Sequence, residues 1–363
     1  MVESDLEGPW VKADHAFDSV ARAVPNGDRV FQVISSYDDV RFLVEKVPGY
    51  EAGDTLKLIA PLLVAHGADD RFLREVAASP ENTRMVPGAR ETIDYLRGGD
   101  QFYLISTSYQ QYVEFISSFL GVPKENTFCT SFPVERLSAG IREKDIRMVK
   151  DWTKRIAAMP PIEVDDSGVI LVSCRDAKQA LDEFFWGILP ESSFGPLMEA
   201  VKPVGGNRKY DALLKALSRE GRSLAGSSVI GDSITDSVML SKARDAGGLA
   251  VSFNGNRYSI RNSNVAILSG NCWATAAVLE VHGKGGVEAV KEAADGWDPL
   301  VFGRLESEGL LGPVLAKQLH AAFPSGDSFP KVYWLEDAGV DAVIAESEAF
   351  RKKIRGTSIG SLG

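Results

Sequence analysis

The sequence predicts an α/β protein built on a Rossmann-like, doubly wound parallel sheet. Short continuous apolar runs lead to this prediction, because such runs are typical of strands buried on both faces of a parallel sheet. The runs that end in small or acidic residues lie at 101–107, 227–233, 248–254 and 264–269. Amphipathic helical patterns follow two of them, at 109–121 and 235–247. Ligands of such sheets bind beyond the carboxyl ends of the strands, where candidate chemistry is therefore expected.

Length and residue spacing divide the chain into parts. At about 150 residues per domain, 363 residues predict two or three packed units. The core of the sheet is expected to draw on residues 1–16, 84–134 and 200–275. We expect a helical cap at 17–83 and a second, mixed α/β insertion at 135–199, with a strand at 168–174. Residues 276–363 are expected to form a C-terminal helical extension that ends in a frayed Gly/Ser-rich tail.

Composition excludes several classes of partner and location. The chain has 40 Lys and Arg against 50 Asp and Glu, a net charge of −10, whereas nucleic-acid binding needs clustered positive charge. No apolar run reaches the roughly 18 residues of a membrane span, and the N-terminus lacks a signal-peptide layout, so we expect no membrane partner and a cytoplasmic location. The three cysteines are far apart, which argues against a disulfide framework and a zinc site.

Two acidic residues follow the apolar run at 227–233. Asp232 lies at the expected carboxyl end of that strand, and Asp236 lies near the start of the next helix, so their carboxylates are expected close to one point. A turn role for Asp232 and a capping role for Asp236 explain the same pattern equally well.

A second acidic pair stands near the N-terminus. Asp5 and Glu7 are separated by one residue, and alternate residues at a strand end point the same way, so both carboxylates are expected to face one pocket. Only four residues precede Asp5, so either the first strand is short or the true start lies upstream. A disordered acidic N-terminus is the alternative interpretation.

A hydroxyl-rich turn and one lysine complete the candidate residues. Ser106, Thr107 and Ser108 follow a buried run and precede a helix, so they offer hydroxyls and backbone N–H groups to an anion. Lys209 lies just inside a predicted helix. Helix capping and a solvated surface lysine are the ordinary alternatives.

The order of these motifs resembles the haloacid dehalogenase (HAD) superfamily of phosphatases and phosphotransferases. That family has a strand ending in Asp-x-Asp, a strand ending in Ser or Thr, a Lys, and a strand ending in Gly-Asp-x-x-x-Asp. The passage DAGGLAVSFNGN (245–256) is similar to the phosphoserine-phosphatase-like branch. The wider pattern also resembles a little-studied, mainly archaeal HAD-like group sometimes labelled energy-converting hydrogenase subunit R, which implies a protein partner. Glu7 departs from the usual second Asp, although branches resembling enolase-phosphatase carry Asp-x-Glu-Gly.

The resemblance implies a Mg²⁺-dependent phosphatase that acts on a small phosphorylated metabolite. Asp5 would be the nucleophile and form an aspartyl-phosphate, and Glu7 would be the general acid and base. Ser106 and Lys209 would bind the phosphoryl group, within a turn that includes Thr107. The residues implied around Mg²⁺ are Asp5, Glu7 through its backbone carbonyl, Asp232, and Asp236, which would orient a bound water or Lys209.

Two other functions remain open on the sequence. One is phosphoryl transfer to an alcohol acceptor, and the other is a non-catalytic HAD-like scaffold subunit with a protein partner or a second copy of the chain. Asp14 and His15 lie close enough to the first motif to approach the site, although a surface or capping role suits them better. The aromatic run 184–186 is expected to be core rather than substrate pocket.

Overall fold

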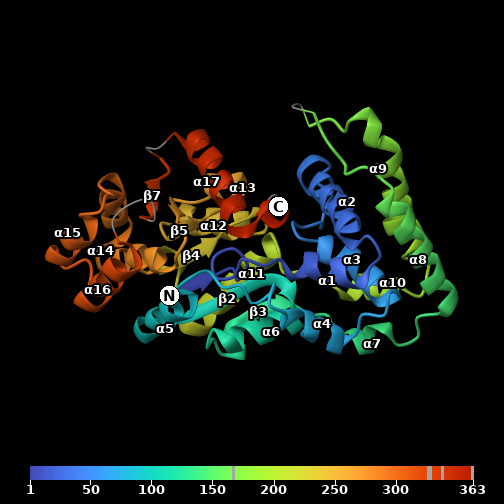
Figure 1. Ribbon diagram of the computed structural model, residues 1–363, viewed down its shortest axis with the longest axis horizontal. Helices are drawn as coiled ribbons and strands as arrows, with labels where there is room; N and C mark the ends of the chain where they lie inside the picture. The colour runs from blue at the N-terminus through green and yellow to red at the C-terminus, as the bar shows by residue number, and fades with distance from the viewer. Residues whose placement is uncertain (166–167, 325–328, 337–338, 361–363) are drawn as a thin grey trace.

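The computed structural model describes residues 1–165, 168–324, 329–336 and 339–360, which form an α/β fold around one seven-stranded sheet (Figure 1). The strand order is β3-β2-β1-β4-β5-β6-β7, parallel except for the last pair. The strands are β1 Val2–Ser4, β2 Phe102–Tyr109, β3 Thr127–Thr130, β4 Ser228–Gly231, β5 Leu249–Phe253, β6 Val265–Leu268 and β7 Lys331–Trp334. The four strands predicted from the apolar runs at 101–107, 227–233, 248–254 and 264–269 are present in this sheet, and the predicted fold class is confirmed.

Helices cover both faces of the sheet, because alternate residues of each strand enter different hydrophobic clusters. Leu104 and Ile230 pack with helices α5 (Ala89–Gly99), α6 (Gln110–Phe119) and α14 (Trp273–Asp295). Tyr103 and Val229 point to the other face and pack with α11 (Asn207–Glu220) and α12 (Ser237–Asp245). Burial on both faces explains why these strands are continuously apolar in the sequence.

The two inserted segments form one helical unit, which lies on the right of Figure 1. Its first segment contains α1 (His15–Ala23), α2 (Gly27–Asp39), η1 (Val40–Val44), α3 (Thr55–Ala65) and α4 (Asp70–Ala77). Its second contains α7 (Val134–Ser138), α8 (Glu143–Ala157), η3 (Val172–Cys174), α9 (Arg175–Asp182), η4 (Glu183–Ile188) and α10 (Gly195–Ala200). A single hydrophobic cluster joins Ile34 and Leu62 to Val149 and Phe185, so the two segments share one core.

The strand expected at 168–174 is not formed, which corrects the mixed α/β interpretation of that insertion. Its backbone makes one isolated bridge, between Val164 and Ile170, before the turn η3. Val169 and Val172 are 51% and 74% exposed, so this apolar run has no sheet to bury it. An isolated pair of short strands is at best marginally stable in water, and the helical surroundings supply no third strand.

The C-terminal segment contributes a strand as well as helices. It contains α15 (Val301–Ser307), α16 (Pro313–Ala322), β7, α17 (Val340–Arg355) and α18 (Thr357–Gly360). Strand β7 pairs antiparallel with β6 at the sheet edge, a feature that the sequence did not indicate. The expected frayed tail is a helical turn at Thr357–Gly360, with Ile359 buried, and its last residues, 361–363, lie outside the described residues.

Helix α17 packs back onto the sheet beside α13 (Arg257–Arg261). Val343 and Ile344 form a small cluster with Ile260 and Leu268, and the Ser347 hydroxyl donates to the Gly255 carbonyl at 2.7 Å. These contacts fix the helix near the carboxyl ends of the strands, where Figure 1 shows it beside α13. The remaining short helices are η2 (Lys124–Asn126), η5 (Leu224–Gly226) and η6 (Ile234–Asp236).

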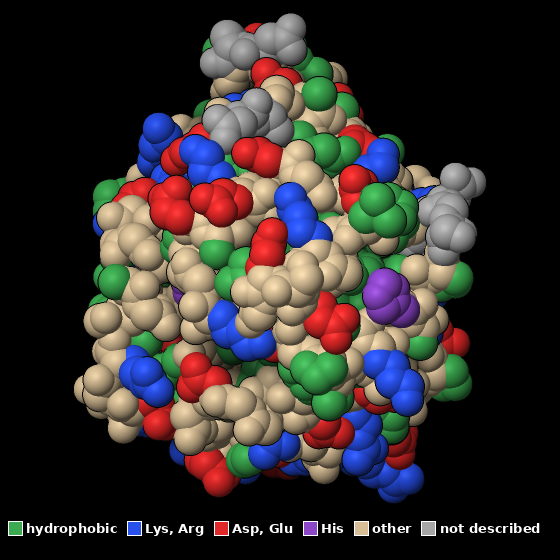
Figure 2. Space-filling model, turned by 90° about the vertical axis from the view of Figure 1, so that its left-hand side faces the viewer, with side chains coloured by type: hydrophobic (Ala, Val, Ile, Leu, Met, Phe, Trp, Pro, Cys, Tyr) green, Lys and Arg blue, Asp and Glu red, His purple; other side chains and the backbone are tan. Residues whose placement is uncertain are grey.

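The face at the left of Figure 1 carries acidic and basic side chains interspersed with scattered hydrophobic ones (Figure 2). Leu300, just before α15, and Val314, near the start of α16, are 78% and 65% exposed. Within the described ranges, none of the helices is both long and apolar enough to cross a bilayer.

Glu3 lies fully buried in the central strand β1, and within the described ranges neither of its carboxyl oxygens has a hydrogen-bond partner. Burial raises the pKa of this carboxyl to about 8, opposed by the N-terminal ammonium. Between its unfolded value near 4.5 and about 8, the folded chain therefore binds more protons than the unfolded chain, and stability falls as pH rises.

We predict that Glu3→Gln, which cannot ionise, removes this loss. The free energy of unfolding is measured by urea titration of both proteins at pH 5 and at pH 8. The difference between Glu3→Gln and wild type should shift in favour of Glu3→Gln by at least about 1 kcal/mol from pH 5 to pH 8. The same substitution at the exposed Glu292 is the control. An equal pH dependence in Glu3→Gln and wild type would contradict the prediction.

Candidate active site

The two acidic motifs converge where the strand order reverses direction. Strand β1 lies between β2 and β4, so the chain runs outward on both sides of the gap between β1 and β4. Such a switch point leaves a crevice at the carboxyl ends of the strands, the usual ligand site of doubly wound sheets. Asp5 follows β1 and Asp232 follows β4, with the Asp5 N–H bonded to the Ile230 carbonyl at 2.9 Å.

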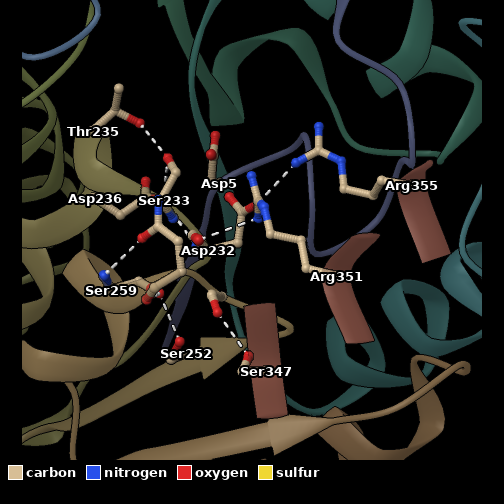
Figure 3. A network of polar contacts seen from close by, with 12 residues as sticks. Asp5, Asp232, Ser233, Thr235, Asp236, Ser252, Ser259, Ser347, Arg351 and Arg355 are labelled. Carbon is tan, nitrogen blue, oxygen red and sulfur yellow. Dashed lines mark hydrogen bonds and ion pairs between the residues drawn. The ribbon is translucent and has the colours of Figure 1, made fainter. Parts of the chain in front are cut away.

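Three carboxylates gather at this crevice. One oxygen from each of Asp5, Asp232 and Asp236 lies within 4.8 Å of the others, and all three residues are at most 5% exposed (Figure 3). Lys209, at the start of α11, reaches this group from the side: its Nζ lies 2.8 Å from Asp5 Oδ1 and 2.6 Å from Asp236 Oδ1. The sequence therefore located all four residues, although they come from separate parts of the chain.

Asp236 shapes the loop that carries Asp232. Its Oδ2 accepts the backbone N–H groups of Asp232 and Ser233 at 2.9 and 3.0 Å, and its Oδ1 accepts from Lys209. Gly231 makes the tight turn possible, because a Cβ there would lie 2.4 Å from the Asp236 Cβ. The sequence suggested Asp236 as an N-cap, but the N-cap of this turn is Ser233, and Asp236 is the N3 residue of the capping box, whose side chain accepts the Ser233 N–H.

Gly8 brings the first motif against the second. Its backbone has φ of +100°, and a Cβ at this position would lie 2.1 Å from Asp232 Oδ2. The glycine after Glu7 is therefore required both by the backbone conformation and by the close approach of the Asp232 carboxylate.

Glu7 is held beside the three carboxylates but not among them. Its Oε1 accepts the His15 backbone N–H at 2.7 Å, and its Oε2 accepts the Ser108 hydroxyl. Burial, and then the charge of Asp14, raises the pKa of this carboxyl to about 8, although the bonds from Ser108 and His15 oppose the shift. Glu7 can therefore carry a proton at neutral pH.

The acidity of Asp5 is perturbed by the same two causes as that of Glu7, burial and the charge of a neighbouring Asp. Burial, followed by the Asp236 charge, raises the pKa of Asp5 to about 7, against the opposing charge of Lys209. The pKa of Lys209 is raised above its ordinary range, because attraction to Asp236 and Asp5 outweighs the burial that would lower it. The lysine is thus a permanent cation inside the site.

Of the three hydroxyl residues predicted to face an anion, Ser106 lies away from the cavity and Thr107 and Ser108 line it. Ser106 is fully buried, accepts the Ser108 N–H at 3.2 Å, and is not among the residues that line the cavity described below. Thr107 and Ser108 line that cavity, and the Thr107 hydroxyl donates to the Val204 carbonyl at 3.0 Å. Phosphoryl binding by Ser106, Thr107 and Lys209 stays a prediction.

A cavity of about 120 Å³ lies between the carboxylates and the helical unit. The sheet side contributes Asp5, Glu7 and Asp232, and the helical unit contributes Asp14, Asp38 and Asp39. Asp14 also accepts the Phe17 N–H at 2.9 Å as the N-cap of α1, so it combines the expected capping role with a place at the cavity wall. His15 is buried and stacks on Tyr112 at 4.6 Å, and Phe184 and Phe185 are core residues as expected.

Two arginines that the sequence did not single out complete the charged group. Arg351 and Arg355, one turn apart on α17, both contact Asp232 Oδ2 and both line the cavity (Figure 3). The sequence offers one signal for them, the i, i+4 spacing of Ser347, Arg351 and Arg355. An exposed polar helix face has the same spacing, so this signal does not distinguish buried arginines from exposed ones. The acidic Asp38 and Asp39 were missed for the same reason.

The residues present fit a divalent cation with oxygen ligands. Asp5 and Asp232 offer carboxylate oxygens at one point, as Mg²⁺ requires, and the all-oxygen set disfavours zinc or copper. Both Asp236 oxygens already accept hydrogen bonds from the chain, which suits an orienting role. The Glu7 carboxylate lies outside the group, and a contribution from its backbone carbonyl stays a prediction.

We predict that Gly8→Ala disrupts the approach of the two motifs. Gly67 offers a matched control, because its φ of +88° imposes similar backbone strain while no atom lies within 4 Å of a Cβ there. In urea unfolding, Gly67→Ala should cost on the order of 1 kcal/mol, and Gly8→Ala at least about 1–3 kcal/mol more, because it adds a clash with Asp232. Equal losses in the two variants would contradict the prediction.

One solved structure shares the fold over the whole chain, and others match more weakly. The structure of gene product AF1437 from Archaeoglobus fulgidus matches with a TM-score of 0.80 and 27% identity, over 100% of this chain and 98% of that one. A phospho-aspartyl intermediate analogue of phosphoserine phosphatase matches with a TM-score of 0.42 and 15% identity, over 73% of this chain and 91% of that one. A probable phosphoserine phosphatase from Vibrio cholerae matches with a TM-score of 0.43 and 13% identity, over 80% and 66%. No protein-family model and no curated protein matches the sequence.

Proposed function

We propose that the chain is a Mg²⁺-dependent phosphatase that hydrolyses a small phosphomonoester through an aspartyl-phosphate on Asp5. The observation that carries this proposal is the convergence of Asp5, Asp232, Asp236 and Lys209 at the switch point of the sheet. These four residues belong to the two acidic motifs and the lysine motif of the HAD-like signature, and they come from separate segments of the chain. The hydroxyl motif is the one motif of the signature that they do not include. The resemblance to the archaeal HAD-like group also implies a protein partner, which we propose separately from the phosphatase activity.

Asp232 and Asp5 would hold the Mg²⁺, which when bound supplies positive charge against the phosphoryl oxygens and so lowers their repulsion of the nucleophile. The chain itself supplies a second positive charge. Lys209 is buried between Asp5 and Asp236, where its charge opposes the burial that raises the pKa of Asp5 and so favours and orients the ionised nucleophile.

Asp5 is positioned for attack through one of its two oxygens. Its Oδ1 accepts the Leu6 N–H at 2.8 Å and faces Lys209, and within the described ranges Oδ2 has no hydrogen bond. In the first step an Asp5 oxygen bonds to phosphorus while the bond from phosphorus to the leaving oxygen breaks. In the second step a water oxygen attacks the same phosphorus and releases the Asp5 carboxylate with inorganic phosphate.

Glu7 is the group that moves protons in both steps. Its raised pKa, about 8, keeps it protonated near neutral pH, so it can give its proton to the leaving alkoxide. The resulting carboxylate then takes a proton from the attacking water. The bonds from His15 and Ser108 fix both Glu7 oxygens, so the side chain is aimed rather than free.

The helical unit acts in this proposal as a cap over the sheet site, with 17–83 and 135–199 together forming it. Its loop reaches the core: Asp54 pairs with Arg208 at 2.5 Å, and Glu51 accepts the Asn207 N–H at 2.9 Å. In this closed arrangement the cavity of about 120 Å³ is below the roughly 300–1,000 Å³ of drug-sized ligand sites. A small leaving group fits this space.

We predict that wild-type protein releases phosphate from p-nitrophenyl phosphate in the presence of Mg²⁺, and that Asp5→Asn lowers kcat by at least about 10³-fold because it removes the nucleophile. Phosphate release is measured directly, and circular dichroism checks folding. Asp28→Asn, at an exposed position on α2, is the matched control and should retain activity.

Comparable turnover in Asp5→Asn and wild type would refute the nucleophile. Adding an alcohol acceptor separates hydrolysis from transfer: phosphorylated acceptor in place of phosphate would make the chain a phosphotransferase. The scaffold alternative is favoured by one observation, the pairing of Asp232 with Arg351 and Arg355. A wild-type chain that binds no divalent cation would support the scaffold over the phosphatase.

A further inference from the structure

Two buried arginines meet at one oxygen of the candidate metal site. Arg351 and Arg355 are 3% and 6% exposed, and their guanidinium groups both contact Asp232 Oδ2 (Figure 3). The Coulomb attraction between groups this deeply buried is screened less than that between surface charges, and breaking such a pair leaves a costly unpaired charge. The Asp232 oxygen that would serve a divalent cation is therefore already neutralised by the chain.

The two arginines are held in different ways. Arg355 is fixed independently of Asp232, because its Nε and Nη2 donate to the backbone carbonyls of Lys12 and Ala13 at 3.2 and 2.6 Å. Within the described part of the chain, the partners of Arg351 are both on Asp232, its Oδ2 and, at 3.3 Å, its carbonyl oxygen. The Arg351 Nε is buried and has no partner there. The position of Arg351 thus depends on the charge of Asp232.

A divalent cation at Asp232 would change that balance. The cation and the Arg351 guanidinium would compete for the same carboxylate oxygen and repel each other. A buried guanidinium that loses its partner is costly unless another anion replaces it. Arg351 lines the cavity that Asp5 and Glu7 also line, and its planar fork of N–H donors suits a phosphoryl group.

We propose that Arg351 changes partner during the working cycle: it pairs with Asp232 when no cation is bound and with the anionic group of the substrate when one is. Arg355 stays in place on the Lys12 and Ala13 carbonyls and keeps the end of α17 against the site. Arg351 is then a substrate-binding residue contributed by the C-terminal extension. This inference rests on the proposed phosphatase function.

The test measures cation and anion affinity separately, without turnover. Mn²⁺ binding is followed by electron paramagnetic resonance, and orthovanadate binding to the Mn²⁺-loaded protein by calorimetry. Arg351→Met keeps the length of the side chain and removes its charge. We expect it to bind Mn²⁺ at least about 5-fold more tightly, because a competitor is gone, and vanadate at least about 10-fold more weakly.

Two further variants calibrate the result. Arg351→Lys retains a positive charge without the planar fork, and we expect both affinities to lie between those of wild type and Arg351→Met. Lys352→Met, on the exposed side of the same helix, should leave both affinities unchanged. Circular dichroism checks that each variant folds. If Arg351→Met does not fold, the Mn²⁺ and vanadate affinities of Arg351→Lys decide the test.

Opposite shifts in the two affinities support the proposal, because a merely structural arginine would weaken both on removal. Unchanged or weaker Mn²⁺ binding in the folded variants overturns it. If wild-type protein releases phosphate in an Asp5-dependent way and Mn²⁺ affinity does not respond to Arg351, the inference alone fails. If neither wild type nor variants bind Mn²⁺, the proposed function fails and the inference fails with it.

Discussion

The structure depends on keeping several negative charges together where little water reaches them. Asp5, Asp232 and Asp236 approach within 4.8 Å of one another while nearly fully buried, an arrangement that is costly without compensating charge. Lys209 compensates two of these carboxylates and the arginines of α17 compensate the third. Elements from the beginning, middle and end of the chain thus bring charges of opposite sign that compensate one another at the site.

This requirement also explains local features that otherwise look unrelated. Gly8 and Gly231 lack side chains where carboxyl groups approach the backbone, and the loop after β4 donates its amides to Asp236 rather than to solvent. Glu7 lies just outside the compensated group, so burial favours its protonated form. The site therefore places a carboxyl group that favours its protonated form beside the carboxylates that are paired with cations, an arrangement suited to acid–base chemistry on a phosphate ester.

Sequence alone predicted the sheet and the convergence of its acidic motifs, because buried parallel strands and strand-end residues leave local patterns. It did not predict the short strand β7, whose four residues pair only at a sheet edge, and it placed a strand at 168–174, where apolar residues lie in a turn region. Arg351 and Arg355 escaped notice because nothing local distinguishes a buried arginine on a helix from an exposed one. Their partner is set by long-range packing.

The hydrogen bond from Arg355 to the Lys12 carbonyl joins residues 343 positions apart in the chain. During synthesis on the ribosome, the acidic loops emerge long before the helix that neutralises Asp232. Until α17 is released, Asp232 therefore lacks the two guanidinium groups that compensate it, whereas Lys209 is already available to Asp5 and Asp236. The charge balance of the site is therefore complete only after α17, near the end of the sequence, has joined the fold.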